Sequence, residues 1–515
     1  MNRRALTLLL IIALPLSVWA KPAMAAGFDT QSAASVWGAA LSYIAPRALE
    51  ALSIPQMTLW GLNGLTALDP DLKAQLQDNQ IRLYGPEQLL IAVPAPAAED
   101  AQGWGNAAAA VANAAFAASP ALQQAGTPGI IESFFDELFN HFDPYSRYEP
   151  PLQAAQDQLL ITGIAGTGLT FGRQDNKVVI TAVAAASPAA EAGLTVGTIL
   201  LALNGHPAYP SQVASLNGQL NGILGSQVIL RIVDPAADAS GTDITLTRAL
   251  VPAQTVFNES GSADIPGALI LKIAGFNKGT SEQFSAALEA GLGAPQPPNA
   301  LILDLRGNRG GVLRQAVLIA DSLLDHGKIA NAVGRDPDAD QDFTAEGTDL
   351  TAGLPMVILV DGQTASAAEI LAAALADDGR AVVVGSATLG KGLVQTVTAL
   401  PDGGELYVTW SRVLAPRGWP LQTLGVLPQV CTSLGAADLR LQLEALMRGA
   451  NRLEAALLAS RAARAPLPVD KILSIRNHCP ASIGGDLDFK AAQALLASNT
   501  AYHAALLPAS PAISP

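Results

Sequence analysis

The sequence predicts a multidomain α+β protein, in which a small β domain precedes an α/β layer and helical segments lie at both ends. Three observations predict this class. Residues 158–251 contain short β-type runs separated by Gly, Asn and Pro turns. Residues 252–430 alternate apolar strands with helical segments. The flanks, 26–126 and 431–515, are rich in Ala and Leu and read as helical.

The composition limits the class of partner. The chain has 515 residues, 50% of them hydrophobic and 14% charged, which is enough for several domains with real cores. Its 30 basic and 44 acidic residues give a formal charge of −14, and no run of Lys or Arg stands out. Nucleic acid is therefore not an expected partner.

The N-terminus has the layout of a signal peptide over residues 1–25. Arg3 and Arg4 precede an apolar stretch over 5–19, and small residues follow, ending at Ala25. Cleavage after Ala25 is favoured, and cleavage after Ala20 also fits. The alternative is a membrane anchor, but the apolar stretch is shorter than the roughly 20 residues that span a bilayer. We expect an exported protein, periplasmic or extracellular after signal-peptide removal.

The N-terminal region 26–126 contains an Ala-rich run, 106–118, that fits only a helix. Residues 127–157 form a helical lead-in to the core, because apolar residues recur at helical spacing over 130–142. Asp143, Pro144, Tyr145 and Ser146 then predict a turn.

The β domain and the core follow from their patterns. Strands of the β domain are expected at 168–171, 178–183, 198–203 and 227–233. Core strands are expected at 268–273, 300–305, 355–360 and 381–384, and core helices at 281–292, 313–324 and 365–376. Such alternation favours a buried, partly parallel sheet.

The chain has two cysteines, Cys431 and Cys479. In an exported chain they can form a disulfide, whose loop would stabilise the fold by roughly 4 kcal/mol in the chain-entropy model, but the sequence does not show that the two sulfurs meet. Two distant cysteines without nearby histidines make a poor zinc site, and no metal is expected.

A first unusual loop follows the strand at 356–360. Residues 361–369 read Asp-Gly-Gln-Thr-Ala-Ser-Ala-Ala-Glu and run into a helix. Ser366 would stand at the helix N-terminus, where free N–H groups can stabilise an oxyanion. The alternative is an N-cap or filler serine in an Ala-rich helix. The Ser366-Ala367 pair, taken by itself, favours that alternative.

A second unusual loop, 385–392, follows the strand at 381–384. Its spacing imitates a phosphate-binding loop, but Gly392 stands where a Ser or Thr would bind magnesium, so a nucleotide site is disfavoured. Lys391 lies between two glycines, which allow an unusual backbone conformation. The alternative is a surface lysine.

A lysine is the best available base. No Gly-x-Ser-x-Gly motif occurs, and the histidines lie outside both loops, at His141, His206, His326, His478 and His503. A Ser-Lys dyad requires only a desolvated lysine that is partly neutral, and Lys391 is the candidate. Gln395 would lie about 13 Å from Lys391 on a straight strand, so it can orient the amine only if the chain bends at Gly392.

Five segments in order resemble the C-terminal processing, or tail-specific, serine peptidases with a PDZ domain, over roughly 130–430. The segments are Leu-Phe-Asn-His-Phe-Asp-Pro-Tyr-Ser (138–146), Ser-Pro-Ala-Ala-Glu-Ala-Gly-Leu (187–194) with Gly197 and Leu203-Asn204-Gly205, Asp-Leu-Arg-Gly-Asn-Arg-Gly-Gly (304–311), Thr-Ala-Ser-Ala-Ala-Glu-Ile (364–370) and Gly-Lys-Gly-Leu-Val-Gln (390–395).

This resemblance implies a PDZ-like domain inserted before a ClpP/crotonase-like protease core. It implies Ser366 as nucleophile, Lys391 as general base and Gln395 as the group that holds the lysine. The backbone N–H groups of Gly310 and Ala367 would form the oxyanion hole. No cofactor is implied, and Asp304, Arg306 and Glu369 are interpreted as structural.

The PDZ-like domain would take the C-terminal carboxylate of a substrate tail at Gly166, Thr167, Gly168 and Leu169, with apolar tails favoured. The expected partners are proteins or peptides with accessible C-termini. The helical flanks resemble dimerising elements of the family and make self-association an expectation.

Three positions depart from the family pattern: Arg309 replaces a proline, Thr198 replaces an aspartate after Gly197, and Gln429 replaces an aspartate near the end of the core. Arg309 lies beside an expected oxyanion donor. The competing function is a catalytically weak PDZ-type scaffold that binds peptides, which would not require the Ser, Lys and Gln set.

Overall fold

The computed structural model describes residues 27–233, 241–261 and 265–508, in two compact units. The first unit contains the described residues up to Gly38 and residues 57–138. The second unit contains residues 39–56 and the described residues from Phe139 onward. The expected signal peptide lies outside the described residues. Among the helices that are described, none is both long and apolar enough to cross a bilayer.

The first unit contains helices and a small sheet. Its elements are α1 (Thr30–Arg47) and α2 (Ile54–Leu68), each shared in part with the second unit, then β1 (Lys73–Gln77), β2 (Gln80–Tyr84), β3 (Leu89–Pro94), α3 (Ala101–Ala118) and α4 (Pro120–Phe139). Trp37 of α1 stacks on Phe134 of α4, with ring centroids 4.5 Å apart. The helix expected within 106–118 is present in α3.

The prediction of a helical region over 26–126 missed a small sheet, because β1, β2 and β3 form an antiparallel sheet there beside the helices. Asp78 and Asn79 both have positive φ, 50° and 57°, in the turn that joins β1 to β2. Such a turn suits a two-residue hairpin loop. Ile81 and Leu83 are buried at alternate positions of β2, which is the pattern of a strand. The overall composition of residues 26–126 did not indicate this short strand.

The lead-in to the core has the predicted turn. Helix α4 ends at Phe139, and the Asp143 carboxylate then accepts hydrogen bonds from the N–H groups of Tyr145 and Ser146. Strand β4 (Arg147–Glu149) and helix α5 (Pro151–Thr162) follow.

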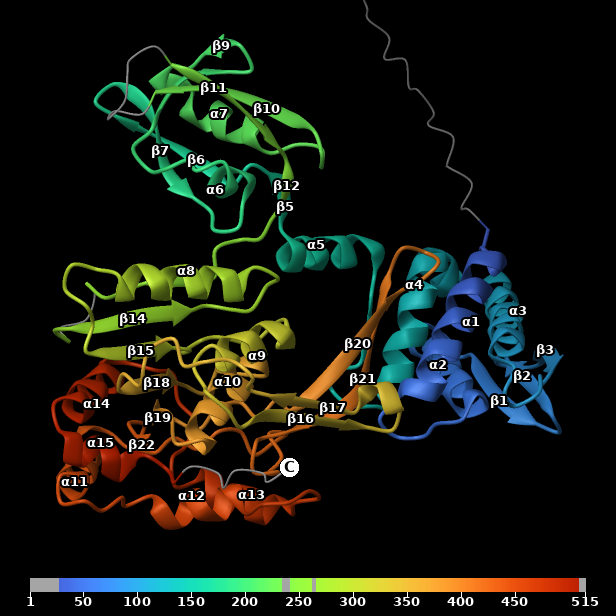
Figure 1. Ribbon diagram of the computed structural model, residues 1–515. Helices are drawn as coiled ribbons and strands as arrows, with labels where there is room; N and C mark the ends of the chain where they lie inside the picture. The colour runs from blue at the N-terminus through green and yellow to red at the C-terminus, as the bar shows by residue number, and fades with distance from the viewer. Residues whose placement is uncertain (1–26, 234–240, 262–264, 509–515) are drawn as a thin grey trace, which may run out of the picture. The chain divides into compact units, whose positions relative to one another are not determined.

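A β domain occupies residues 164–251 (Figure 1). Its strands are β5 (Ile164–Gly166), β6 (Leu169–Gln174), β7 (Lys177–Val183), β8 (Ile199–Leu203), β9 (His206–Pro207), β10 (Gln227–Val233), β11 (Thr242–Thr247) and β12 (Ala249–Val251), and its α-helices are α6 (Pro188–Glu191) and α7 (Val213–Leu220). The main sheet has the order β11-β10-β8-β7-β6, and β5 pairs with β12. The domain has its own apolar core, which includes Phe171, Ile180 and Leu230.

The core of the second unit is a six-stranded sheet of order β13-β14-β15-β18-β19-β22. These strands are β13 (Val256–Asn258), β14 (Ala268–Ile273), β15 (Ala300–Asp304), β18 (Met356–Val360), β19 (Val382–Gly385) and β22 (Val430–Cys431). All neighbours from β14 to β22 are parallel, and β13 is antiparallel to β14. The four core strands predicted from the sequence are present.

Helices cover both faces of this sheet. One face packs on α8 (Thr280–Leu292), α9 (Leu313–Asp321) and α10 (Ala367–Asp377). The other packs on α11 (Ala436–Leu446), α14 (Asp486–Leu496) and α15 (Asn499–Ala505), seen in red beside the sheet in Figure 1. Adjacent strand residues such as Ile358 and Leu359 belong to opposite faces. The C-terminal region therefore completes the core.

A second sheet, which the sequence analysis did not predict, has the order β17-β16-β21-β20, with β4 also paired to β21. Its strands are β16 (Lys328–Gly334), β17 (Gln341–Thr344), β20 (Leu393–Ala399) and β21 (Glu405–Leu414). Because β20 begins two residues after Lys391, this sheet fixes the direction in which the chain leaves the lysine loop.

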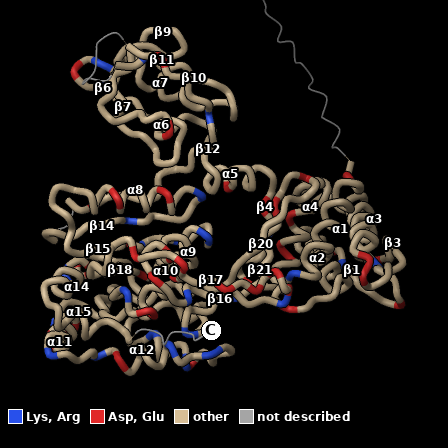
Figure 2. The backbone as a smooth tube through the Cα atoms, in the orientation of Figure 1, with Lys and Arg blue, Asp and Glu red and all other residues tan. Residues whose placement is uncertain are grey.

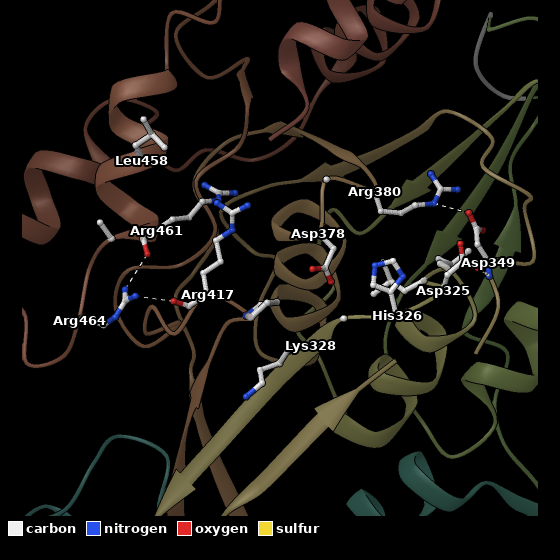
Figure 3. Close-up of a pocket in the computed structure, with 16 residues that line it drawn as sticks. Asp325, His326, Lys328, Asp349, Asp378, Arg380, Arg417, Leu458, Arg461 and Arg464 are labelled. Carbon is white, nitrogen blue, oxygen red and sulfur yellow. Dashed lines mark hydrogen bonds and ion pairs between the residues drawn. The ribbon is translucent and has the colours of Figure 1, made fainter. Parts of the chain in front are cut away.

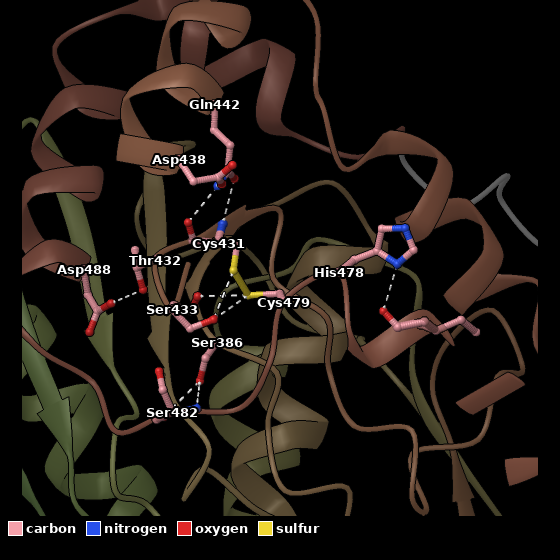
Figure 4. Close-up of a disulfide and its surroundings, with 12 residues drawn as sticks. Ser386, Cys431, Thr432, Ser433, Asp438, Gln442, His478, Cys479, Ser482 and Asp488 are labelled. Carbon is pink, nitrogen blue, oxygen red and sulfur yellow. Dashed lines mark hydrogen bonds between the residues drawn. A yellow bond between two sulfur atoms is a disulfide. The ribbon is translucent and has the colours of Figure 1, made fainter. Parts of the chain in front are cut away.

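A disulfide joins Cys431, at the end of β22, to Cys479, which follows α13 (Val469–Arg476) (Figure 4). Both cysteines are fully buried. The Cys479 carbonyl accepts a hydrogen bond from the N–H of Ala387, at 3.3 Å, in the loop that leads to Lys391. The disulfide therefore anchors the C-terminal region beside that loop.

Charged residues are dispersed over the described chain. Figure 2 shows Lys and Arg interspersed with Asp and Glu in each part of the tube, as expected from a sequence without a basic run.

Candidate active site

The site forms where β18 and β19 end. These strands are parallel neighbours, with Val360 opposite Gly385, so the loops that follow them leave the same edge of the sheet. The loop after β18 carries Ser366 into α10, and the loop after β19 carries Lys391 into β20. Sites in α/β folds form at such carboxyl edges.

Ser366 stands at the N-terminus of α10 in a strained conformation, with φ 56° and ψ −120°. A positive φ is uncommon for a residue other than glycine, and the strain is retained only when the surroundings impose it. The Ser366 side chain makes no capping hydrogen bond and is half-buried. The next N–H, that of Ala367, has no acceptor among the described residues, so it is available to an oxyanion beside Ser366.

Glu369 joins the two loops. Its side chain is fully buried, and one oxygen, Oε2, accepts hydrogen bonds from the N–H of Ser366 at 2.8 Å and from the N–H of Lys391 at 2.9 Å. The backbone nitrogens of Ser366 and Lys391 therefore lie close together, because both donate to the same oxygen. Oε1 accepts from the N–H of Gly390 at 2.7 Å and from the Thr388 hydroxyl.

Burial raises the pKa of Glu369, and these four hydrogen bonds oppose that rise. Glu369 was interpreted from the sequence as structural, and its link to both loops was not predicted. Its position three residues after Ser366, at the first turn of a helix, was the available signal.

The Lys391 side chain lies in a partly buried, aromatic environment. Its Nζ is 4.6 Å from the centroid of the Tyr145 ring. Burial lowers the pKa of Lys391, the Arg147 guanidinium lowers it further, and the Asp143 carboxylate opposes both effects. A lysine with a lowered pKa is more often neutral and can accept a proton at lower pH.

This environment predicts opposite pH effects of two substitutions. Arg147→Gln removes a repulsive charge, so the pKa of Lys391 rises and the acidic limb of kcat/KM against pH moves to higher pH. Asp143→Asn removes an attractive charge but keeps an oxygen that can accept the turn hydrogen bonds, so the limb moves to lower pH. The measurement is kcat/KM for peptide cleavage as a function of pH. Limbs that stay fixed, or that both move in one direction, contradict the assignment of Lys391 as the titrating base.

Gln395 contacts a neighbouring strand. Strand β20 has a bulge between Val394 and Gln395, and the Gln395 amide donates to the Thr409 hydroxyl at 3.0 Å and to the Leu393 carbonyl at 3.3 Å. Thr409 in turn donates to Asp143 at 2.7 Å. No hydrogen bond between Gln395 and Lys391 occurs in the described chain, so the expected role of Gln395 in holding the amine stays a prediction.

The loop after β15 brings Gly310 against Ser366. A Cβ added to Gly310 would lie 2.8 Å from the Cβ of Ser366, and the φ of Gly310 is 92°, so only glycine fits this approach. The Gly310 N–H, however, donates to the buried Asn308 side chain at 2.8 Å. Its expected role as an oxyanion donor therefore requires release from Asn308. Arg309 is exposed.

The C-terminal region supports all three loops. The buried Asp361 carboxylate accepts from the N–H groups of Gly307 at 3.0 Å and Gly484 at 3.2 Å. The Ser482 carbonyl accepts from the Gly362 N–H at 2.7 Å and from the Ser386 hydroxyl at 3.0 Å. Residues 482–484 thus tie together the loops that carry Gly310, Ser366 and Lys391.

The predicted peptide-binding loop lies in the β domain. Gly166, Gly168 and Leu169 line a cavity of about 920 Å³, and Thr167 is buried beside them. A φ of 79° at Gly168 brings its backbone close to Ser187, where an added Cβ would meet the Ser187 Cβ at 2.2 Å. The Thr167 carbonyl accepts from the Ala189 N–H at 3.0 Å, which fixes the loop to α6.

Comparison with known proteins shows similarity to a family of peptidases. The model of peptidase family S41 matches residues 267–432. The chain is 32% identical over 306 residues to a chloroplastic C-terminal processing peptidase of Tetradesmus obliquus, covering 56% of this chain and 64% of the relative. It is 30% identical over 289 residues to a carboxyl-terminal-processing protease of Picosynechococcus sp., covering 56% of this chain and 69% of the relative.

Among solved structures, the photosystem II D1 C-terminal processing protease aligns with a TM-score of 0.34 and 29% identity, over 59% of this chain and 80% of that one. The chain spans slightly less than two thirds of the length of the Tetradesmus relative. The fold and site define an α+β protein with a serine at a helix N-terminus beside a partly buried lysine. The chain belongs to peptidase family S41.

Proposed function

We propose that this protein is a serine endopeptidase of the C-terminal processing type that cleaves peptide bonds of exported proteins. The observation that carries the proposal is the shared oxygen of Glu369, which holds the N–H groups of Ser366 and Lys391 together at the carboxyl edge of the sheet. A strained serine and a lysine with a lowered pKa are the two groups that a Ser-Lys mechanism needs.

In this mechanism the Ser366 hydroxyl attacks the carbonyl carbon of the scissile peptide bond, and the neutral Lys391 amine takes its proton. The N–H of Ala367 stabilises the oxyanion of the tetrahedral intermediate. The amine of the cleaved bond leaves with a proton from Lys391, and an acyl-enzyme remains. Lys391 then removes a proton from water, which attacks the ester carbonyl. The protonated lysine gives that proton to the departing Ser366 oxygen, and the cleaved peptide leaves with a new C-terminal carboxyl group.

Two contacts of this mechanism are not made in the structure. No hydrogen bond links Ser366 to Lys391 in the described residues, and the N–H of Gly310 is donated to Asn308. Catalytic hydrogen bonds often tighten only when substrate binds. The same two observations favour the second candidate, a catalytically weak scaffold that binds peptides, and the experiment below separates the two.

Substrate selection is assigned to the β domain, which we propose is PDZ-like, inserted before a crotonase-like core. An extended tail would add as a strand beside β6, with its carboxylate at the loop 166–169. The apolar lining of the adjacent cavity, such as Leu169 and Val183, supports a preference for apolar C-terminal tails. Export and a periplasmic or extracellular location are part of the proposal, and self-association would fall to residues 27–126, since C-terminal helices cover the sheet.

The test is covalent labelling combined with digestion. A fluorophosphonate probe reacts with activated serines, so we expect it to label Ser366 in the wild type, located by mass spectrometry of the peptides. Ser366→Ala should lose the label, and Ser474→Ala, at an exposed serine, should keep it. The wild type should also digest casein. A folded wild type that binds casein but neither takes the label nor cuts would support the scaffold instead.

A further inference from the structure

A second cavity, of about 690 Å³, lies at the C-terminal end of α10, the helix that begins beside Ser366 (Figure 3). Because α10 has 11 residues, the two ends are about 16 Å apart. The cavity is bordered by Asp378 after α10, by Arg417 and by Arg461 of α12 (Glu454–Arg461), with apolar contributions from Leu323 and Leu458. Its volume suits a small organic ligand.

One wall of the cavity contains a buried cationic side chain, that of Arg461. Arg461 is 4% exposed, and its Nε donates to Asp377 at 2.7 Å. Its Nη2 is buried and has no hydrogen-bond partner among the described residues. A buried charged donor without an acceptor is costly. This N–H therefore indicates that an acceptor from outside the protein fits here.

A second guanidinium reinforces this wall. Figure 3 shows the side chains of Arg417 and Arg461 converging on one region, and the charge of Arg417 lowers the pKa of Arg461, after the larger effect of burial. Arg464 holds the backbone of this wall, donating to the carbonyls of Arg461 at 3.0 Å and Arg417 at 2.9 Å. Arg417 Nη2 itself donates to the carbonyls of Asp377, at 3.1 Å, and Pro508, so its contribution to a bound carboxylate is the positive charge of its guanidinium group beside that of Arg461.

Asp378 provides the opposite charge. Its Oδ2 is buried and has no hydrogen-bond partner in the described structure. Burial, and then the charge of Asp377, raises the pKa of Asp378 to about 6, although the charges of His326 and Arg417 act against this rise. The nearby cations Arg380 and Lys328 are paired elsewhere, with Asp349 at 2.9 Å and Asp342 at 2.8 Å. Neither Arg380 nor Lys328 therefore supplies a hydrogen bond to the buried Oδ2 of Asp378.

From these two unsatisfied groups of opposite charge, we infer that the cavity binds a small zwitterion, a free amino acid or a short peptide. Its carboxylate would meet Arg461 and Arg417, its ammonium group would meet Asp378, and an apolar side chain would contact Leu323 and Leu458. This site is separate from Ser366 and Lys391 and does not depend on their role.

The experiment uses the folded chain with Ser366→Ala, so that no peptide is hydrolysed, and isothermal titration calorimetry at pH 7.5. The probes are L-leucine and the dipeptide Leu-Leu, together with N-acetyl-leucine, which lacks the ammonium group, and leucinamide, which lacks the carboxylate. We expect saturable binding of leucine or of the dipeptide, which identifies the ligand size. Each blocked derivative should bind about tenfold or more weakly, since a hydrogen bond to a charged group is lost.

Variants locate the site. Asp378→Asn should remove the preference for leucine over N-acetyl-leucine, and Arg417→Gln should remove the preference for leucine over leucinamide. Arg461→Lys keeps a charge beside Asp377 and should weaken binding, whereas Arg448→Gln, at an exposed arginine, should not. Circular dichroism confirms that each variant is folded. The inference is overturned by an absence of saturable binding, by equal binding of the blocked probes, or by unchanged preferences in folded Asp378→Asn and Arg417→Gln.

Discussion

Lys391→Met is expected to lower kcat/KM for the cleavage of casein by about 10²- to 10⁴-fold, the usual contribution of a positioned general base. Methionine has about the length and apolar volume of lysine, so it can occupy the place over Tyr145 without an amine. The Ser366 hydroxyl would then remain with no group to take its proton. The measurement is the initial rate of casein digestion at pH 8, with circular dichroism to verify the fold.

The control for this variant is Lys278→Met, which removes an exposed lysine and should leave the rate unchanged. A folded Lys391→Met protein that cuts casein at the wild-type rate would show that another group activates Ser366. Partial activity that rises with added small amines would instead support the assignment, because an amine in solution can replace the missing base.

Glu369→Ala is expected to reduce both stability and activity. The substitution removes the acceptor of the N–H groups of Ser366, Gly390 and Lys391 and of the Thr388 hydroxyl, and the Glu369 side chain that is lost is fully buried. An unsatisfied buried group costs about 1 to 3 kcal/mol, so we expect a loss of about 3 kcal/mol or more in the free energy of unfolding. Urea denaturation measures this loss.

Activity should fall further than stability explains. Without Glu369, Ser366 loses the contact that holds its positive φ, and the Lys391 loop is released from α10. Rates measured well below the unfolding midpoint separate this effect from unfolding. Glu289→Ala, at an exposed position of α8, is the matched control. A folded Glu369→Ala protein with wild-type kcat/KM would mean that the two loops do not depend on this carboxylate.

The two loops that carry Ser366 and Lys391 could be predicted because each follows a strand made almost wholly of apolar residues, and parallel strands end at one edge of the sheet. The partners of Gln395 could not be predicted in the same way. Its contact, Thr409, lies on β21, which pairs with β20 through a bulge, and no local pattern reveals where a bulge falls. The Gln395 side chain therefore contacts Thr409 of the neighbouring strand, which a distance along a straight strand from Lys391 does not take into account.

The packing of the N-terminal and C-terminal flanks also could not be predicted from the sequence. Ala and Leu composition correctly indicated helices after residue 436, but it did not show that α11, α14 and α15 cover one face of the central sheet. Amino-acid composition indicates the propensity of a segment to form a helix. The face of the sheet that the helix covers depends on contacts with residues far away in the sequence. In the N-terminal region the same composition concealed the short strands β1, β2 and β3, whose clearest signal was the Asp78-Asn79 turn.

The contacts between residues 482–484 and the three loops that carry Gly310, Ser366 and Lys391 have a consequence for biosynthesis. A chain that emerges from N-terminus to C-terminus presents Ser366 and Lys391 long before Ser482 and Gly484 are available to hold their loops. The loops of Ser366 and Lys391, the proposed nucleophile and base, therefore gain these C-terminal contacts only when nearly the whole chain has been made. Under the proposed Ser-Lys mechanism, a partly made chain would therefore lack a fully supported site and should not cleave its own unfolded segments.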